Sequence, residues 1–201
     1  MIQRKTRHSL TKTKILSVGI DVGSLNGAIS VVDQDLKVLL LTKTPIIQTE
    51  IKSRRNKCKL NKETQKYEKD FRKRSWVDFK KVGELFKPFI GRKVIYSLER
   101  ATVRPFEGET SSFMNGYALG VFQSVSLLLN PIEYYEPLPG VWKADLGVTS
   151  EKETSIKLAE DLYQISLREY LPKGKVDDIA EALLLSFYGL RQHFIFKEGE
   201  K

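Results

Sequence analysis

The hydrophobic and polar positions of this 201-residue chain alternate between runs typical of strands and stretches with helical spacing. ILSVGID is a continuous apolar run that ends at a polar residue, and it predicts a first strand, buried on both faces, over about residues 15–21. GAISVVD and LKVLLLTK follow, separated by polar turn residues, so we expect them to continue from the first strand as a hairpin. Three antiparallel strands therefore open the fold.

The second half of the chain predicts further helices and strands in alternation. Apolar residues at helical spacing precede Gly91, where we expect a helix to stop: Val82, Leu85, Phe86 and Phe89. KVIYSLE predicts a fourth strand, and IEYYEP predicts a short fifth strand. Between them TSSFMNGYALGVFQSVSLLL predicts a long helix, in which Gly116 and Gly120 would let one face approach the sheet closely.

Two helices complete the predicted fold. Ser150 and Glu153 have the spacing of a capping box before an amphipathic segment, and Asp177 or Asp178 can begin the last helix. The resulting order, β-β-β-α-β-α-β-α, predicts an α/β domain with a mixed five-stranded sheet and helices on both faces.

Basic residues concentrate in two segments. Residues 1–14 contain five basic residues and no acid, and residues 51–75 contain eleven basic residues and three acids. The rest of the chain holds 18 basic and 22 acidic residues, so the formal net charge of +9 comes from these two arms. Such arms suit a polyanion, because phosphate contacts release counterions. The alternative is a solubilising loop, since charge runs are often only solvated.

We divide the chain into a basic N-terminal arm at residues 1–14, one domain at 15–193 and a C-terminal tail at 194–201. The domain carries a basic insertion at about 50–75, which is polar and without apolar periodicity. We expect this insertion to be exposed and partly disordered when no ligand is bound. With 41% hydrophobic residues, the chain can bury one real core.

Metal sites built on cysteine and histidine are not expected. Cys58 is the single cysteine, and His8 and His193 lie far apart in sequence, so no zinc-type spacing exists. No apolar run approaches the ~20 residues of a membrane span, and the basic start is not followed by a secretory apolar region. We therefore expect a soluble, cytoplasmic protein.

Four acidic residues lie where an apolar segment meets a polar edge. Asp21 ends the first strand, Glu99 ends the fourth, and Asp178 and Glu181 share one face at the start of the last helix, where Asp177 competes with Asp178. Carboxylates that are gathered together repel one another and need a cation. Hard divalent ions such as Mg²⁺ prefer oxygen ligands, which they share with substrate phosphates. The pattern indicates metal-dependent phosphodiester chemistry.

Each acid also has a purely structural alternative. Asp21 could cap a turn, and Glu99 could form an ion pair with Arg100 or Arg104. The two adjacent aspartates could be helix N-caps, because anionic residues favour that end of a helix. Glu181, on a helix otherwise rich in alanine and leucine, is the hardest to explain in this way.

Three segments carry a family resemblance through their order and spacing: GIDVGSLNGAISVVD, IYSLERA and DDIAEALLLSFYG. They resemble the ribonuclease-H-like nucleases and, among these, the RuvC-like Holliday junction resolvases of the phage type. PGVWKADLGVTSEKETSIKLAEDL resembles the family segment that runs from a lysine after the fifth strand into a capped helix. The resemblance covers most of residues 14–190. In such a sheet strands one and four are parallel neighbours, which would bring Asp21 and Glu99 together at their carboxyl ends.

The resemblance implies a crossover junction endodeoxyribonuclease of DNA recombination and repair. Such enzymes are homodimers that cut four-way DNA junctions and leave 5′ phosphate and 3′ hydroxyl ends. The resemblance implies two Mg²⁺ ions per active site, for which Mn²⁺ can substitute. Asp21 would bridge both ions, Glu99 would hold one, and Asp178 and Glu181 would hold the other, with Asp177 as helix cap or outer group. Glu181 stands where many relatives have Asp.

Residues near the acids and in the insertion are expected to contact DNA. The loop and helix after Glu99 offer side chains of types that contact phosphates: Arg100, Arg104, Ser111, Ser112 and Asn115. Lys143 and Lys152 resemble basic residues that contact DNA in the family. The insertion adds Arg54, Arg55, Arg72, Lys73 and Arg74.

Several aromatic residues have two interpretations. Phe106 or Phe113 could wedge between bases at an open junction. The sequence favours a core position for Phe113 and Met114 instead, and Phe106 could instead cover the loop. Trp142 either stacks on DNA or anchors packing. The helix from Phe113 to Leu129 is apolar on more than one face, which makes it the expected dimer interface; full burial of this helix within one subunit is the alternative.

Three other functions compete with junction cleavage. GIDVGS also resembles a phosphate loop of sugar kinases and actin-like ATPases, but those proteins need a second lobe for which 201 residues leave no room. A nuclease acting on flapped or branched DNA or on structured RNA would carry the same acids. A non-catalytic nucleic-acid-binding module is the third alternative, which the intact acids oppose.

Overall fold

The computed structural model describes residues 14–23, 26–52, 58–60, 67–69, 71–101 and 108–199, and within these it leaves out the side chains of 51–72 and 196–199. Its centre is a mixed five-stranded sheet, in the order β3-β2-β1-β8-β9. The strands are β1 (Leu16–Asp21), β2 (Ala28–Asp33), β3 (Val38–Lys43), β8 (Val94–Leu98) and β9 (Glu133–Tyr135). β1, β2 and β3 pair antiparallel, whereas β8 is parallel to both β1 and β9. The predicted sheet and its strand order along the chain are confirmed.

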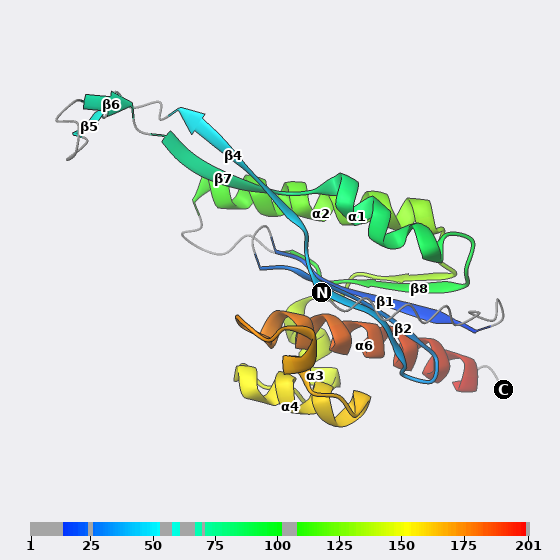
Figure 1. Cartoon of the computed structure of the whole chain (residues 1–201). Helices are drawn as coiled ribbons and strands as arrows, with labels where there is room; N and C mark the ends of the chain where they lie inside the picture. The colour runs from blue at the N-terminus through cyan, green and yellow to red at the C-terminus, as the bar shows by residue number, and fades with distance from the viewer. Residues whose placement is uncertain are drawn as a thin grey trace.

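Helices cover both faces of the sheet (Figure 1). One face carries α1 (Phe79–Phe86), a 3₁₀ turn η1 (Lys87–Phe89) and α2 (Glu109–Leu129). The other carries α3 (Pro139–Asp145), α4 (Lys152–Tyr163), α5 (Leu167–Tyr170) and α6 (Asp177–Gly199). A separate cluster of buried apolar side chains fills each interface, and β1 and β8 are therefore buried on both faces.

α6 lies unusually close to the sheet because of small residues in the strands beneath it. A Cβ at Gly19 of β1 would collide with the backbone carbonyl of Ala182, and one at Gly189 of α6 would collide with the Ser97 hydroxyl. The hydroxyls of Ser17 and Ser30 donate hydrogen bonds of 2.7 Å to carbonyl oxygens of α6. These contacts fix the height and rotation of α6 over β1, and therefore the position of its acidic first turns.

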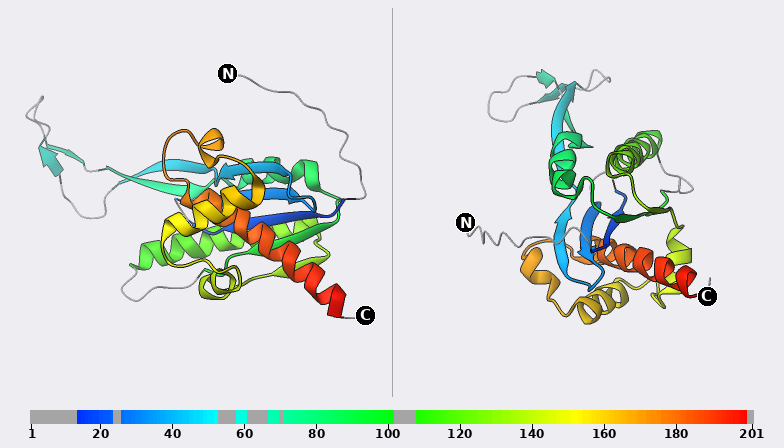
Figure 2. Two further views of the ribbon diagram at one scale, coloured as in Figure 1. Left: turned by 90° about the horizontal axis from the view of Figure 1, so that it is seen from below. Right: turned by 90° about the vertical axis from the view of Figure 1, so that its right-hand side faces the viewer.

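The basic insertion is a hairpin that projects from the body (Figures 1 and 2). β4 (Ile46–Lys52) pairs antiparallel with β7 (Phe71–Val77), and β5 (Cys58–Leu60) pairs with β6 (Tyr67–Lys69) near its tip. The pattern of residues 50–75 did not predict these strands. Their register comes from cross-strand pairing, and residues 46–50 of β4 are exposed, so that stretch has no buried face to reveal it.

Other details differ from the predictions. α3 and α5 were not predicted, because both are short, and α6 continues to Gly199, through most of the segment interpreted as a tail from residue 194. The Ser150–Glu153 capping box does not form, since Glu151 is the N-cap of α4 and its side chain makes no capping hydrogen bond. Gly116 and Gly120 face open space instead of the sheet. The close-packing role predicted for these two glycines is wrong.

Candidate functional site

Asp21 and Glu99 lie side by side at one edge of the sheet. Asp21 is the last residue of β1, and Glu99 follows the last residue of β8. The two strands are parallel, with Ile20 opposite Leu98, and the Glu99 amide donates to the Ile20 carbonyl at 2.9 Å. Both carboxylates therefore stand at the carboxyl ends of adjacent parallel strands, where open α/β sheets bind ligands.

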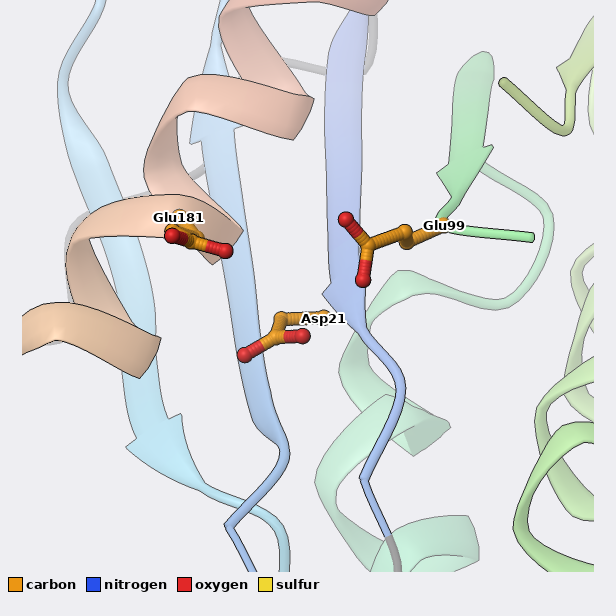
Figure 3. Close-up of side chains that lie close together, drawn as sticks. All are labelled: Asp21, Glu99 and Glu181. Atoms are coloured by element: carbon orange, nitrogen blue, oxygen red, sulfur yellow. The ribbon is translucent and has the colours of Figure 1, made fainter. Parts of the chain in front are cut away.

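Glu181 joins them from the first turns of α6. One carboxylate oxygen each from Asp21, Glu99 and Glu181 lies within 4.8 Å of the others. Figure 3 shows Asp21 between the other two, with all three carboxylates converging on one space. All three residues are half-buried, so the cluster remains partly open to solvent.

The two other acids in the first turn of α6 point to different neighbours. Asp178 forms an ion pair with Lys43 at the end of β3, and it is near enough to Asp21 for its charge to act on that carboxylate. Asp177 is nearly buried and forms an ion pair with Lys152 of α4. Asp178 thus borders the cluster, whereas Asp177 is turned toward α4.

The carboxylates are in an unfavourable electrostatic setting. Burial raises the pKa of Asp21 well above its ordinary value, and the charges of Glu99, Glu181 and Asp178 raise it further. Burial also raises the pKa of Glu99, although a hydrogen bond from Trp142 partly opposes that shift. For Asp177, burial works against the ionised form, but the hydrogen bond and charge of Lys152, a backbone hydrogen bond and the charge of Lys43 together outweigh it and lower the pKa.

Three lysines from three different elements neutralise the acids of α6. Besides the pairs of Lys43 and Lys152, Lys143 of α3 donates to a Glu181 oxygen at 2.7 Å. Among the residues that the structure describes, no cationic side chain neutralises Asp21, whose interactions are with other carboxylates. An oxygen-only cluster with uncompensated negative charge fits a hard divalent cation such as Mg²⁺ or Mn²⁺.

Trp142 contacts the acidic cluster through a hydrogen bond. It is fully buried on α3, and its indole N–H donates to Glu99 Oε1 at 3.0 Å. The structure therefore supports the interpretation of Trp142 as a packing anchor over its interpretation as a residue that stacks on DNA. The hydrogen bond to Glu99 was not foreseen, and neither was the ion pair between Lys43 and Asp178, because both join elements far apart in sequence.

The other residues expected to contact DNA lie at varying distances from the acids. Arg100 is exposed and pairs with Glu136 at 3.8 Å, so the predicted alternative of an Arg100–Glu99 pair does not form. Ser111, Ser112 and Asn115 occupy the first turns of α2, where Ser111 is exposed and the other two are half-buried. Lys143 and Lys152 turn toward the acids, as described above.

The aromatic residues and the insertion residues differ in their exposure. Met114 is buried, whereas Phe113 is 64% exposed and contacts the Trp76 ring edge-on, so the core interpretation is wrong for Phe113. Lys73 and Arg74 are exposed on β7. Four predicted contacts fall outside the described residues, as does the side chain of Arg72: Arg54, Arg55, Arg104 and Phe106.

Comparison with known proteins identifies the fold. No protein-family model matches the chain, and no curated protein matches its sequence. Among solved structures, RuvC from T. thermophilus, in complex with a Holliday junction substrate, has a TM-score of 0.52 and 16% sequence identity. The match covers 92% of this chain and 96% of that chain. The chain has a ribonuclease-H-like fold.

Membrane insertion through a helix finds no support. Among the described residues, no helix is both long enough and apolar enough to cross a bilayer.

Proposed function

We propose that this protein is a metal-dependent endonuclease that resolves four-way DNA junctions and leaves 5′ phosphate and 3′ hydroxyl ends. The observation that carries the proposal is the convergence of Asp21, Glu99 and Glu181 at the carboxyl ends of β1 and β8. It is supported by the ribonuclease-H-like fold and by the RuvC structure, which was solved with a Holliday junction. The basic insertion adds a surface suited to nucleic acid.

The acids would hold two Mg²⁺ or Mn²⁺ ions. When bound, such ions supply a hydroxide from water and stabilise the leaving 3′ oxygen. Asp21, which lies between the other acids, would contact both ions. Glu99 would hold one of them, and Glu181 with Asp178 would hold the other and orient the attacking water. Asp177, already paired with Lys152, would stay outside the ligand set.

The lysines around the cluster would contact the DNA backbone. Lys43 and Lys143 bind the carboxylates that the cations would need. Once cations neutralise Asp178 and Glu181, both ammonium groups would be free to contact the phosphates flanking the cut. Arg100 and the first turns of α2, with Ser111, Ser112 and Asn115, would bind the adjacent strand.

The projecting hairpin would grip a duplex arm of the junction. Residues 51–75 carry eleven basic residues and three acids, and the exposed Lys73 and Arg74 lie on β7 near the body. The four insertion and loop residues outside the described part, Arg54, Arg55, Arg104 and the wedge candidate Phe106, remain expected contacts.

A homodimer would supply the two active sites that symmetric cutting requires. α2 presents three exposed apolar side chains, at Phe113, Leu127 and Leu128. Beside Leu128, a groove of about 610 Å³ runs between α1 and α2, lined mainly by apolar side chains and glycines. Because Gly116 and Gly120 leave open space on the helix, a second copy of α2 could approach closely.

Substitution of Asp21 tests the proposed chemistry. We expect Asp21→Asn to abolish junction cutting in Mg²⁺ while leaving junction binding largely intact, because the amide cannot bridge two cations. Asp161→Asn, at an exposed position of α4, is the matched control and should cut normally. If Asp21→Asn nicks DNA at the normal rate, the assignment is wrong.

A further inference from the structure

Trp142 is buried in the core, and its indole N–H is the one polar group of its side chain that needs a hydrogen-bond acceptor. Its side chain is fully buried and belongs to the apolar cluster that includes Val148, Ala159 and Leu183. Pro139 sits in the first turn of α3 and fixes the start of the short helix that carries it. A tryptophan N–H is a donor only, and a buried donor needs an acceptor.

Glu99 provides that acceptor, and the hydrogen bond fixes the orientation of its carboxylate. Its side chain has three rotatable bonds and stands just beyond the end of β8, where the strand no longer restrains it. The bond from the Trp142 indole to Oε1, 3.0 Å long, restrains those rotations. Groups that hold a metal ligand in this way commonly change metal affinity or activity about 10- to 100-fold when they are removed.

We propose that Trp142 is a positioning residue for Glu99, whose carboxylate its indole N–H holds in the orientation that a divalent cation requires. This inference rests on the proposed metal-dependent function. It also makes Trp142 a natural reporter, because a cation bound by Glu99 would lie one side chain away from the indole. The chain has two tryptophans, Trp76 and Trp142, so a single substitution isolates the signal.

The first measurement uses the full chain with Trp76→Phe, in which Trp142 is the sole tryptophan. Titration with Mn²⁺, a paramagnetic quencher, should lower the emission of Trp142 in a saturable manner, and Ca²⁺ should compete with it. Quenching that rises without saturation, or no quenching at all, would overturn the inference. This readout does not depend on the folding of any variant at position 142.

The second measurement compares Trp142→Phe with Tyr96→Phe by calorimetry with Mn²⁺. Tyr96 is also fully buried, and its hydroxyl donates to the Phe122 carbonyl at 2.9 Å, so Tyr96→Phe loses a comparable bond on β8 but away from the acids. Both variants should be destabilised. Only Trp142→Phe should also weaken Mn²⁺ binding, by about 10- to 100-fold, and raise the Mg²⁺ concentration for half-maximal cutting.

The outcomes separate the inference from the proposed function. If the wild type binds Mn²⁺ and cuts DNA, but Trp142→Phe binds Mn²⁺ as tightly as Tyr96→Phe does, Trp142 is only a packing residue and the positioning role is refuted. If the wild type binds no Mn²⁺ at all, both the inference and the proposed function fail.

Discussion

Asp21 is a carboxylate whose ionisation the folded chain opposes. Burial and three neighbouring acids raise its pKa, whereas in the unfolded chain the same group has an ordinary pKa. Between those two values the folded state binds a proton that the unfolded state has released. The free energy of unfolding contributed by this group therefore falls as pH rises through that window.

This loss of stability with rising pH gives a prediction for the metal-free protein. Asp21→Asn removes the penalty, so the variant should melt at a higher temperature than the wild type at pH 8. The difference should shrink toward pH 4, because a larger fraction of Asp21 is protonated in the folded state at lower pH. Thermal denaturation of both proteins with a chelator present, at several pH values, measures this difference in melting temperature. The control Asp161→Asn, at an exposed position of α4, should show no dependence of the difference on pH. An equal gain at both pH values would contradict the account.

The residues of the cluster differ in how far the sequence predicts them. Asp21 and Glu99 end strongly apolar strands, and adjacent parallel strands bring such ends together, so their proximity was predictable. Trp142 contacts Glu99 across 43 residues of chain, and Lys43 contacts Asp178 across 135 residues. Those contacts depend on how α3 and β3 pack beside α6, which no local pattern encodes.

At the scale of elements, predictability follows the apolar pattern. Long apolar segments bounded by turns mark β1, β2, β3, β8, α2 and α6, and the sequence predicts all six. β9 has only three residues and was predicted as a short strand. α3 has only seven residues, and β4 and β7 are held by pairing with each other. Elements without a long buried face leave no periodicity in the sequence.

The hairpin gives a prediction of its own. Lys52 and Phe71 are cross-strand partners, so residues 53–70 can be replaced by Asn-Gly, which favours a two-residue turn. This removes seven basic and three acidic residues. Junction binding should weaken, and the slope of its salt dependence should flatten by roughly 0.9 for each phosphate that the hairpin no longer neutralises. Cutting at saturating protein should persist, because the acids lie elsewhere.

A matched variant separates charge from shape in the hairpin. It keeps full length but changes the same seven Lys and Arg residues to Gln, and it should bind as weakly as the shortened chain if phosphate contacts are responsible. Unchanged affinity at several salt concentrations for the shortened chain would remove the hairpin from the binding surface.

The whole molecule is expected to act as a dimer through α2. Leu127→Glu combined with Leu128→Glu would bury two charges in the proposed interface. The side chains that dominate an interface commonly contribute about 2 kcal/mol or more each, so the double variant should raise the dissociation constant of the dimer at least roughly 30-fold. Light scattering over a concentration series measures this. Val141→Glu, at a 53% exposed apolar position on α3 in the other layer, is the control and should remain dimeric. A wild type that stays monomeric throughout would refute the interface.

The most direct test of the central claim is a comparison of substrates. Purified protein with Mg²⁺ is incubated with labelled four-way junction, flap, linear duplex and RNA/DNA hybrid, and the cut positions are mapped. We predict paired, symmetric nicks in the junction, with 5′ phosphate and 3′ hydroxyl ends, and little cutting of the other three. Stronger cutting of the flap or the hybrid would contradict junction resolution.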